Sequence, residues 1–206
     1  MTHTIPRYEF RVFGLEELDP FIDKLRQAGK EGLVRNISEI YLMTAGNTEN
    51  NIKIRDKRLD IKTLVRQDNG LEQWNPREIG EFPLKSEVFR NDIFPALGVE
   101  APFHERDIYT LKEFMRELIL DDPDILVALT SKERHAVDFM DCICEFAYVK
   151  INGALLKTIA IESEIPALVH KAVETLGIDK MENVNYPKAI KRVLGLEIDY
   201  DINKFF

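Results

Sequence analysis

The sequence predicts an α+β protein whose strands form an antiparallel sheet, and two observations support this prediction. The first is a regular alternation of apolar and polar residues, which is typical of strands with one buried face. It is clearest in residues 7–14, RYEFRVFG, where Tyr8, Phe10 and Val12 alternate with charged side chains. The second is that alternating segments follow one another in pairs with few helices between them. This order favours antiparallel hairpins over parallel βαβ units.

Apart from the strand at 7–14, alternation predicts strands in five further places: 37–43, the two arms of a hairpin over 50–65, 125–139, 142–151 and 155–164. The first hairpin turns around Asp56, Lys57 and Arg58, and a second turns at Asn152 and Gly153. Short turns with these residue types are typical of tight β-hairpins.

Helices are expected where apolar residues recur at three- and four-residue spacing: 15–29, 110–122, 165–177 and 185–195. The second of these opens with a capping box formed by Thr110 and Glu113. The other three end at a glycine, which commonly stops a helix. Residues 68–106 break the pattern with four prolines, so we expect an irregular, insertion-like region with short strands there.

Length and composition indicate one soluble domain over residues 1–206. Hydrophobic residues make up 45% of the chain, and the net charge is −8. An acidic protein is not expected to bind nucleic acid or an anionic membrane surface. The sequence has no apolar run of membrane length and no signal-peptide core at its N-terminus, so we expect a cytoplasmic protein. Cys142 and Cys144 are expected to be small buried residues.

Charged residues of both signs recur on the polar faces of the expected strands. The cations are Arg7, Arg11, Lys53, Arg55, Lys62, Lys132 and Arg134. The carboxylates are Glu9, Glu162 and Glu164, with Glu145 as a weaker candidate. A flat sheet would place these faces in solvent. A sheet curled into a barrel would gather them in a polar lumen, with helices packed outside on the apolar face.

Gathered in a lumen, these side chains would suit phosphate chemistry. Arginine and lysine neutralise phosphate oxygens, and arginine does so through bidentate contacts. Closely placed glutamates can hold Mg²⁺ or Mn²⁺, which prefer oxygen ligands and bridge to phosphates. The expected partner is therefore a small-molecule triphosphate, polyphosphate or nucleotide. Assembly into a homo-oligomer is left open by the sequence.

The order of these motifs resembles the CYTH superfamily of triphosphate tunnel metalloenzymes. YEFRVF is similar to the family's E-x-E-x-K strand, and NIKIRDKRLDIKTL to its paired basic strands. SKERHAV is similar to its K-x-R strand, TIAIESE to its E-x-E strand, and NYPKAIKRVLG to its closing helix. The resemblance spans nearly the whole chain and implies an antiparallel eight-stranded tunnel that binds triphosphate with a divalent metal.

Carried over to this sequence, the resemblance implies that Arg11, Lys53, Arg55, Lys62, Lys132 and Arg134 hold phosphate. It implies that Glu9, Glu162 and Glu164 hold metal. One position departs from the family pattern, because Arg7 stands where the E-x-E-x-K strand has its first glutamate. An arginine can hold phosphate but cannot activate a metal-bound water.

Three functions therefore stay open. The first is triphosphate binding with metal-dependent hydrolysis, the second is binding without catalysis, and the third is a class IV adenylyl cyclase. Other notable residues have simpler explanations. Lys57, Arg58 and the charges at 188–192 are expected in solvent, His135 in packing or on the surface, and Trp74 and Phe82 in the core.

Overall fold

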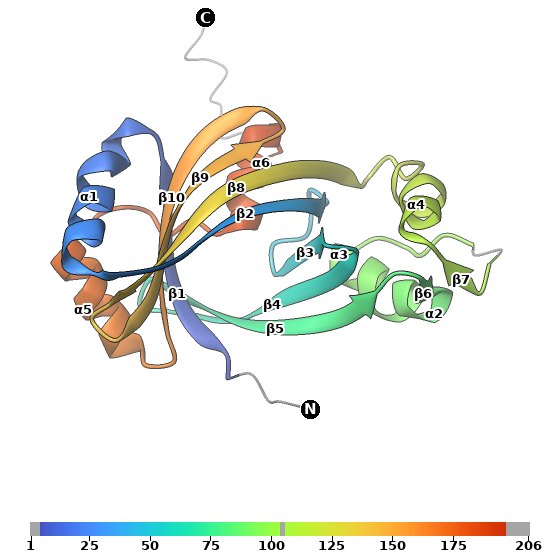
Figure 1. Cartoon of the computed structure of the whole chain (residues 1–206). Helices are drawn as coiled ribbons and strands as arrows, with labels where there is room; N and C mark the ends of the chain where they lie inside the picture. The colour runs from blue at the N-terminus through green and yellow to red at the C-terminus, as the bar shows by residue number, and fades with distance from the viewer. Residues whose placement is uncertain (1–4, 104–105, 197–206) are drawn as a thin grey trace, which may run out of the picture.

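The computed structural model describes residues 5–103 and 106–196, and its central feature is a closed antiparallel barrel of eight strands (Figure 1). Around the barrel the strands are ordered β1 (Arg7–Gly14), β10 (Ala154–Ser163), β9 (Cys142–Ile151), β8 (Leu126–Phe139), β2 (Lys30–Met43), β3 (Asn50–Arg55), β4 (Arg58–Asp68) and β5 (Leu71–Glu81). Pairing of β5 with β1 closes the barrel. The expected α+β class and the eight-stranded barrel are confirmed.

Both predicted hairpin turns are present, and their backbone explains their sequences. Asn152 and Gly153 join β9 to β10 with φ values of 44° and 98°. Asp56 and Lys57 join β3 to β4 with φ values of 49° and 61°. Two consecutive residues with positive φ give the type of turn that matches the twist of a hairpin. Arg58 belongs to β4 and is exposed, as is Lys57.

β2 is twice as long as the segment expected at 37–43, because it begins at Lys30. Its first half pairs with β8 and contains a register shift between Glu31 and Val34. These added residues are mostly exposed on both faces, so they lack the alternation that reveals a half-buried strand. Only the pairing with β8 makes this segment a strand.

The region expected to be irregular, 68–106, contains a full barrel strand. β5 occupies Leu71–Glu81 and pairs with β4 along its length, so the sequence interpretation is wrong there. The reason is Pro76, because proline is unfavourable in a central strand and was therefore taken to exclude one here. In the structure β5 pairs with β1 as far as Trp74, which is paired with Arg7, so Pro76 lies beyond that pairing. An edge position tolerates a residue without an N–H group.

Helices cover one outer side of the barrel as predicted. The 3₁₀ helix η1 (Glu16–Leu18) leads into α1 (Asp19–Ala28), and α5 (Pro166–Leu176) packs beside α1 (Figure 1). Together they bury the outward side chains of β1, β8, β9 and β10. Cys142 and Cys144 are part of this core and are free thiols.

A second outer core lies under residues 82–125. Its short elements are β6 (Leu84–Lys85), α2 (Ser86–Val88), the π-helical turn η2 (Phe89–Ile93), α3 (Phe94–Leu97), β7 (Ile108–Tyr109), α4 (Leu111–Glu113) and the π-helical turn η3 (Phe114–Ile119). The predicted capping box of Thr110 and Glu113 opens α4. Phe89 stacks on Phe82 and on Phe114, Phe82 and Phe114 are tilted against each other, and the three rings pack against the outer faces of β2, β3 and β4. Phe82 is therefore a core residue, as expected.

The last helix, α6 (Tyr186–Leu194), departs from the expectation that the helices pack outside. Its apolar side chains, including Tyr186 and Ile190, pack against Ala147, Val149 and Ile151 of β9. These β9 residues share a face with the lumen residue Glu145, because side chains alternate along a strand. α6 therefore closes one end of the barrel from within.

The charges at 188–192 are correspondingly not all in solvent. Lys191 is buried, and its ammonium donates to the backbone carbonyl of Ala45 at 2.8 Å. Lys188 and Arg192 follow the expectation and form ion pairs with Glu182 at the surface.

Among the described helices, none is both long and apolar enough to cross a membrane.

Replacing Ile190 by alanine tests the role of α6. Ile190 is fully buried in the barrel end, so Ile190→Ala should lower the free energy of unfolding by about 2 to 5 kcal/mol. Denaturant unfolding followed by circular dichroism measures this change. Leu155→Ala is the control, since Leu155 is exposed on β10 and should change stability by less than about 0.5 kcal/mol. Equal stability of both variants would contradict a packed barrel end.

Candidate functional site

The lumen contains a cavity of about 120 Å³ lined almost entirely by polar side chains. Six cations and four carboxylates line it: Arg11, Lys53, Arg55, Lys62, Lys132, Arg134, Glu9, Glu39, Glu145 and Glu162. With all of them ionised, the cations exceed the carboxylates by two. Of the seven cations predicted from the sequence, Arg7 lies apart, in an adjoining cavity of about 60 Å³ that it shares with Lys62 and Glu162.

Arg11 is the centre of one buried network. Its Nε donates to Glu9 Oε1 at 2.6 Å, and its Nη1 donates to Glu145 Oε1 at 2.8 Å. The other oxygen of Glu145 accepts from Arg134 Nε. Burial opposes ionisation of both glutamates, but the neighbouring cations outweigh it and hold the pKa of each below its ordinary value. Glu145, the weaker candidate in the sequence, is thus a central lumen residue.

Glu39 is the centre of a second network and was missed in the sequence. Its carboxylate accepts from Lys53 Nζ at 3.0 Å, contacts Lys132 Nζ at 2.6 Å and accepts from the Tyr41 hydroxyl at 2.9 Å. Although burial works against ionisation, Lys132 and Lys53 lower the pKa of Glu39 to about 2. A signal existed, because Glu39 shares one face of the predicted strand with Ile37 and Tyr41, so it is a carboxylate on an otherwise apolar face.

The pKa values of Lys53 and Lys132 are lowered as well, and for a lysine this disfavours the charged form. Burial lowers the pKa of Lys53 and of Lys132, and the attraction of Glu39 only partly offsets it. The charged form is favoured for Glu39 but not for the lysines, because one carboxylate is shared by two ammonium groups. These cations would therefore gain from a further anion in the lumen.

Glu162 and Glu164, which were predicted to share one face of β10, are separated because the strand ends between them. Glu162 lines the lumen and pairs with Arg7 Nη1 at 3.4 Å. Burial and the nearby Glu9 raise its pKa. Glu164 lies beyond the last residue of β10, Ser163, in a bend that leads into α5, and it is exposed. The alternation that predicted one shared face requires a strand through 164, and β10 ends before it.

Comparisons with known proteins place this barrel among solved folds. HpAC1 from Hippeastrum, described as a candidate adenylyl cyclase with a dominant triphosphatase activity, has a TM-score of 0.53 and 12% identity, over 94% of this chain and 98% of that one. This chain therefore shares the fold of HpAC1. A conserved hypothetical protein from Pyrococcus furiosus has a TM-score of 0.47 and 14% identity, over 87% and 98% of the two chains. A candidate adenylate cyclase from Bacillus halodurans has 0.42 and 11%, over 98% and 100%.

At these identities the likeness concerns the fold alone. No family model matches the chain, and no curated protein matches it. The roles that the CYTH resemblance implies for individual residues therefore remain predictions.

The CYTH resemblance implies a bound divalent metal. As they are arranged here, the lumen carboxylates do not form a site that would coordinate one. Mg²⁺ and Mn²⁺ need several oxygen ligands around one point. Within the described part of the chain, no three acidic, histidine or cysteine side chains gather closely enough to hold an ion. Glu9 and Glu145 are bound to Arg11, and Glu162 is paired with Arg7.

Three of the lumen cations are partly exposed and could exchange their present ion pairs for a ligand. These mouth cations are Arg55, Lys62 and Arg134, whose side chains are 41%, 30% and 31% exposed. Each contacts a buried carboxylate that keeps a deeper partner if the mouth cation moves away. Glu39 keeps its two lysines, while Glu9 and Glu145 both keep Arg11.

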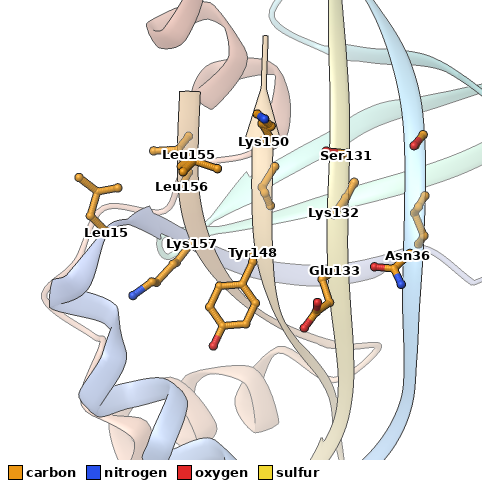
Figure 2. Close-up of a pocket in the computed structure, with 13 residues that line it drawn as sticks. Leu15, Asn36, Ser131, Lys132, Glu133, Tyr148, Lys150, Leu155, Leu156 and Lys157 are labelled. Atoms are coloured by element: carbon orange, nitrogen blue, oxygen red, sulfur yellow. The ribbon is translucent and has the colours of Figure 1, made fainter. Parts of the chain in front are cut away.

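A larger concavity, of about 520 Å³, lies on the outer face of β8, β9 and β10 (Figure 2). Leu15, Tyr148 and Leu155 give it a largely apolar lining, and Lys157 at its edge is paired with Asp19 at 2.6 Å. His135 lies on the same outer side of β8 and stacks on Phe146, with 4.4 Å between the ring centroids. This agrees with the prediction that His135 is in packing or on the surface. The convergent charges are in the lumen, so the lumen is the candidate functional site.

The low pKa of Glu39 makes stability depend on pH in a defined window. The folded pKa of about 2 lies below the ordinary 4.5, so ionised Glu39 stabilises the fold above about pH 4.5. This contribution, roughly 3 kcal/mol, is lost as the pH falls toward 2. We expect Glu39→Gln to be less stable than wild type at pH 7 and to lose less stability between pH 4.5 and 3.

Denaturant unfolding at each pH measures the effect on the free energy of unfolding. Glu164→Gln is the control, because Glu164 is exposed past the end of β10, and it should follow the wild-type pH dependence. If wild type and Glu39→Gln lost the same stability over this window, the ion-pair network around Glu39 would be refuted.

Proposed function

We propose that the barrel lumen binds a triphosphate or another polyphosphate-type anion. The observation that carries the proposal is the convergence of six cationic side chains, from β1, β3, β4 and β8, on one cavity. The chain as a whole has a net charge of −8, so the excess of cations in the lumen is opposite in sign to the charge of the whole chain. An acidic surface with a basic cavity favours a small anion over a polyanionic macromolecule.

The chemistry of the lumen suits phosphate groups. Arg55 and Arg134 offer planar guanidinium groups that can make paired hydrogen bonds to phosphoryl oxygens, and Lys62 adds a point charge. The surrounding barrel limits contact with bulk water, which strengthens these interactions relative to the open surface. The described triphosphatase activity of HpAC1, which shares the fold, supports triphosphate as the first anion to test.

The proposed binding does not require a metal. The lumen glutamates are bound to arginine and lysine, and Arg7 adds a cation where the CYTH pattern has a metal-binding glutamate. Such cations can neutralise phosphate oxygens directly, but they cannot supply a metal-bound hydroxide. The function that these contacts support best is binding without hydrolysis.

Calorimetric titration with tripolyphosphate tests this proposal. We expect saturable binding whose affinity is the same with Mg²⁺, with Mn²⁺ and with a chelator, and no release of phosphate in the same samples. Affinity that rises with metal, together with phosphate release, would instead establish a metal-dependent hydrolase. In that case Glu162→Ala should abolish the release. Formation of a cyclic nucleotide from ATP would identify a cyclase.

Lys62→Met tests the mouth cations. It removes one charge from the lumen, while Glu9 keeps Arg11 as its partner, so the fold should tolerate it. Loss of one charge-assisted contact should weaken tripolyphosphate binding about tenfold or more. Lys57→Met is a matched control on the tip of the same hairpin, where the lysine is exposed. Equal weakening by both variants would indicate non-specific attraction and would exclude a lumen site.

A further inference from the structure

Two polar groups in the lumen are buried without a hydrogen-bond partner. They are the hydroxyl of Tyr186 and Oδ1 of Asn51, for which no described residue supplies a partner. Tyr186 and Asn51 are 7% and 8% exposed, and both line the lumen cavity. Leaving a buried polar group unpaired is costly, so such a pair in one cavity points to something that enters it.

The ring of Tyr186 is fully used in packing, while its hydroxyl is not. The ring stacks on Tyr41 with centroids 5.8 Å apart, and Lys132 Nζ lies 3.9 Å from its centroid. Asn185 caps α6 by accepting from the backbone N–H of Lys188, which fixes Tyr186 at the start of the helix. Burial raises the pKa of Tyr186, so the hydroxyl keeps its proton and can donate it.

Asn51 offers the complementary group. It lies on β3 opposite Lys62 of β4 and on the same face as Lys53, among the cations of the proposed anion site. Its Oδ1 is an acceptor and needs a donor. A fully ionised phosphoryl group has only acceptor oxygens and cannot satisfy it. Water can fill a polar cavity, but a ligand that displaces such water gains affinity only when it reproduces the same hydrogen bonds.

We infer that the lumen selects a phosphorylated ligand that carries its own hydrogen-bond donor, with the Tyr186 hydroxyl donating to the ligand and Asn51 Oδ1 accepting from it. This inference rests on the proposed anion binding and narrows its substrate class. The donor is either a hydroxyl or amino group of an organic phosphate, or the proton of a protonated phosphoryl group. Both sources present an anion together with an O–H or N–H group.

Tyr186→Phe tests the donor half. The variant removes a hydroxyl that has no protein partner and keeps the ring, so its melting temperature should equal or exceed that of wild type. Its affinity for tripolyphosphate should fall about three- to tenfold. Tyr41→Phe is the matched control. The Tyr41 hydroxyl donates to Glu39, so this variant should lose stability.

Asn51→Leu tests the acceptor half with three probes in calorimetry. Sulfate carries no proton at pH 6, inorganic phosphate is protonated at that pH, and ATP carries organic donors. We expect sulfate affinity to stay unchanged and the affinity for phosphate, ATP or both to fall about three- to tenfold. A loss for phosphate identifies the protonated phosphoryl group as the source, and a loss for ATP alone identifies the organic part.

The outcomes separate this inference from the proposed function. The inference would be overturned if Tyr186→Phe bound tripolyphosphate as tightly as wild type does and Asn51→Leu bound every probe as tightly as wild type does. Anion binding by the lumen would then stand. An equal loss for sulfate and phosphate in Asn51→Leu would also overturn the inference, because the amide would then act as a donor. Absence of binding by the wild type to all of these anions would refute both the proposed function and the inference.

Discussion

Ionised side chains inside a closed barrel have to be paired, and the rest of this structure is arranged around that requirement. An isolated charge in a protein interior costs several kcal/mol, and removing one partner of a buried pair costs about 3 to 5 kcal/mol. Arg11 is held between Glu9 and Glu145, and Glu39 between Lys53 and Lys132. Each network joins strands that are far apart in the sequence, so the charges are compensated only when the barrel is closed.

The barrel end filled by α6 gives these pairs their strength. Tyr186 and Ile190 exclude water from the side of the lumen where the lysines and Glu39 lie. A less polar surrounding raises both the cost of an unpaired charge and the attraction between paired ones. The same helix fixes the depth of the cavity, so it shapes the proposed ligand site as well as the core.

The proposed site is therefore divided between fixed and movable charges. The deep cations hold the carboxylates, while the mouth cations can leave them without exposing an unpaired glutamate. Arg7 is partly exposed but differs from the mouth cations, because it is the ion-pair partner of Glu162 at 3.4 Å and its departure would remove that partner. This division is compatible with the proposed anion binding by a lumen whose charges are nearly balanced, while the lumen carboxylates stay paired with cations.

The sequence by itself determined the strands with one buried face, the turns at Asn152 and Gly153, the capping box at Thr110, and the candidacy of Arg11 and Lys132 for a lumen. These features depend on local backbone geometry and on a two-residue period, which neighbouring residues reveal. Tertiary structure decided the rest. Pairing with neighbouring strands made β5 a strand despite Pro76, and the end of β10 separated Glu164 from Glu162. The partners of Glu39 and the unpaired groups of Tyr186 and Asn51 depend on which strands and helices meet in the lumen, and such long-range contacts leave no periodic signal in the chain.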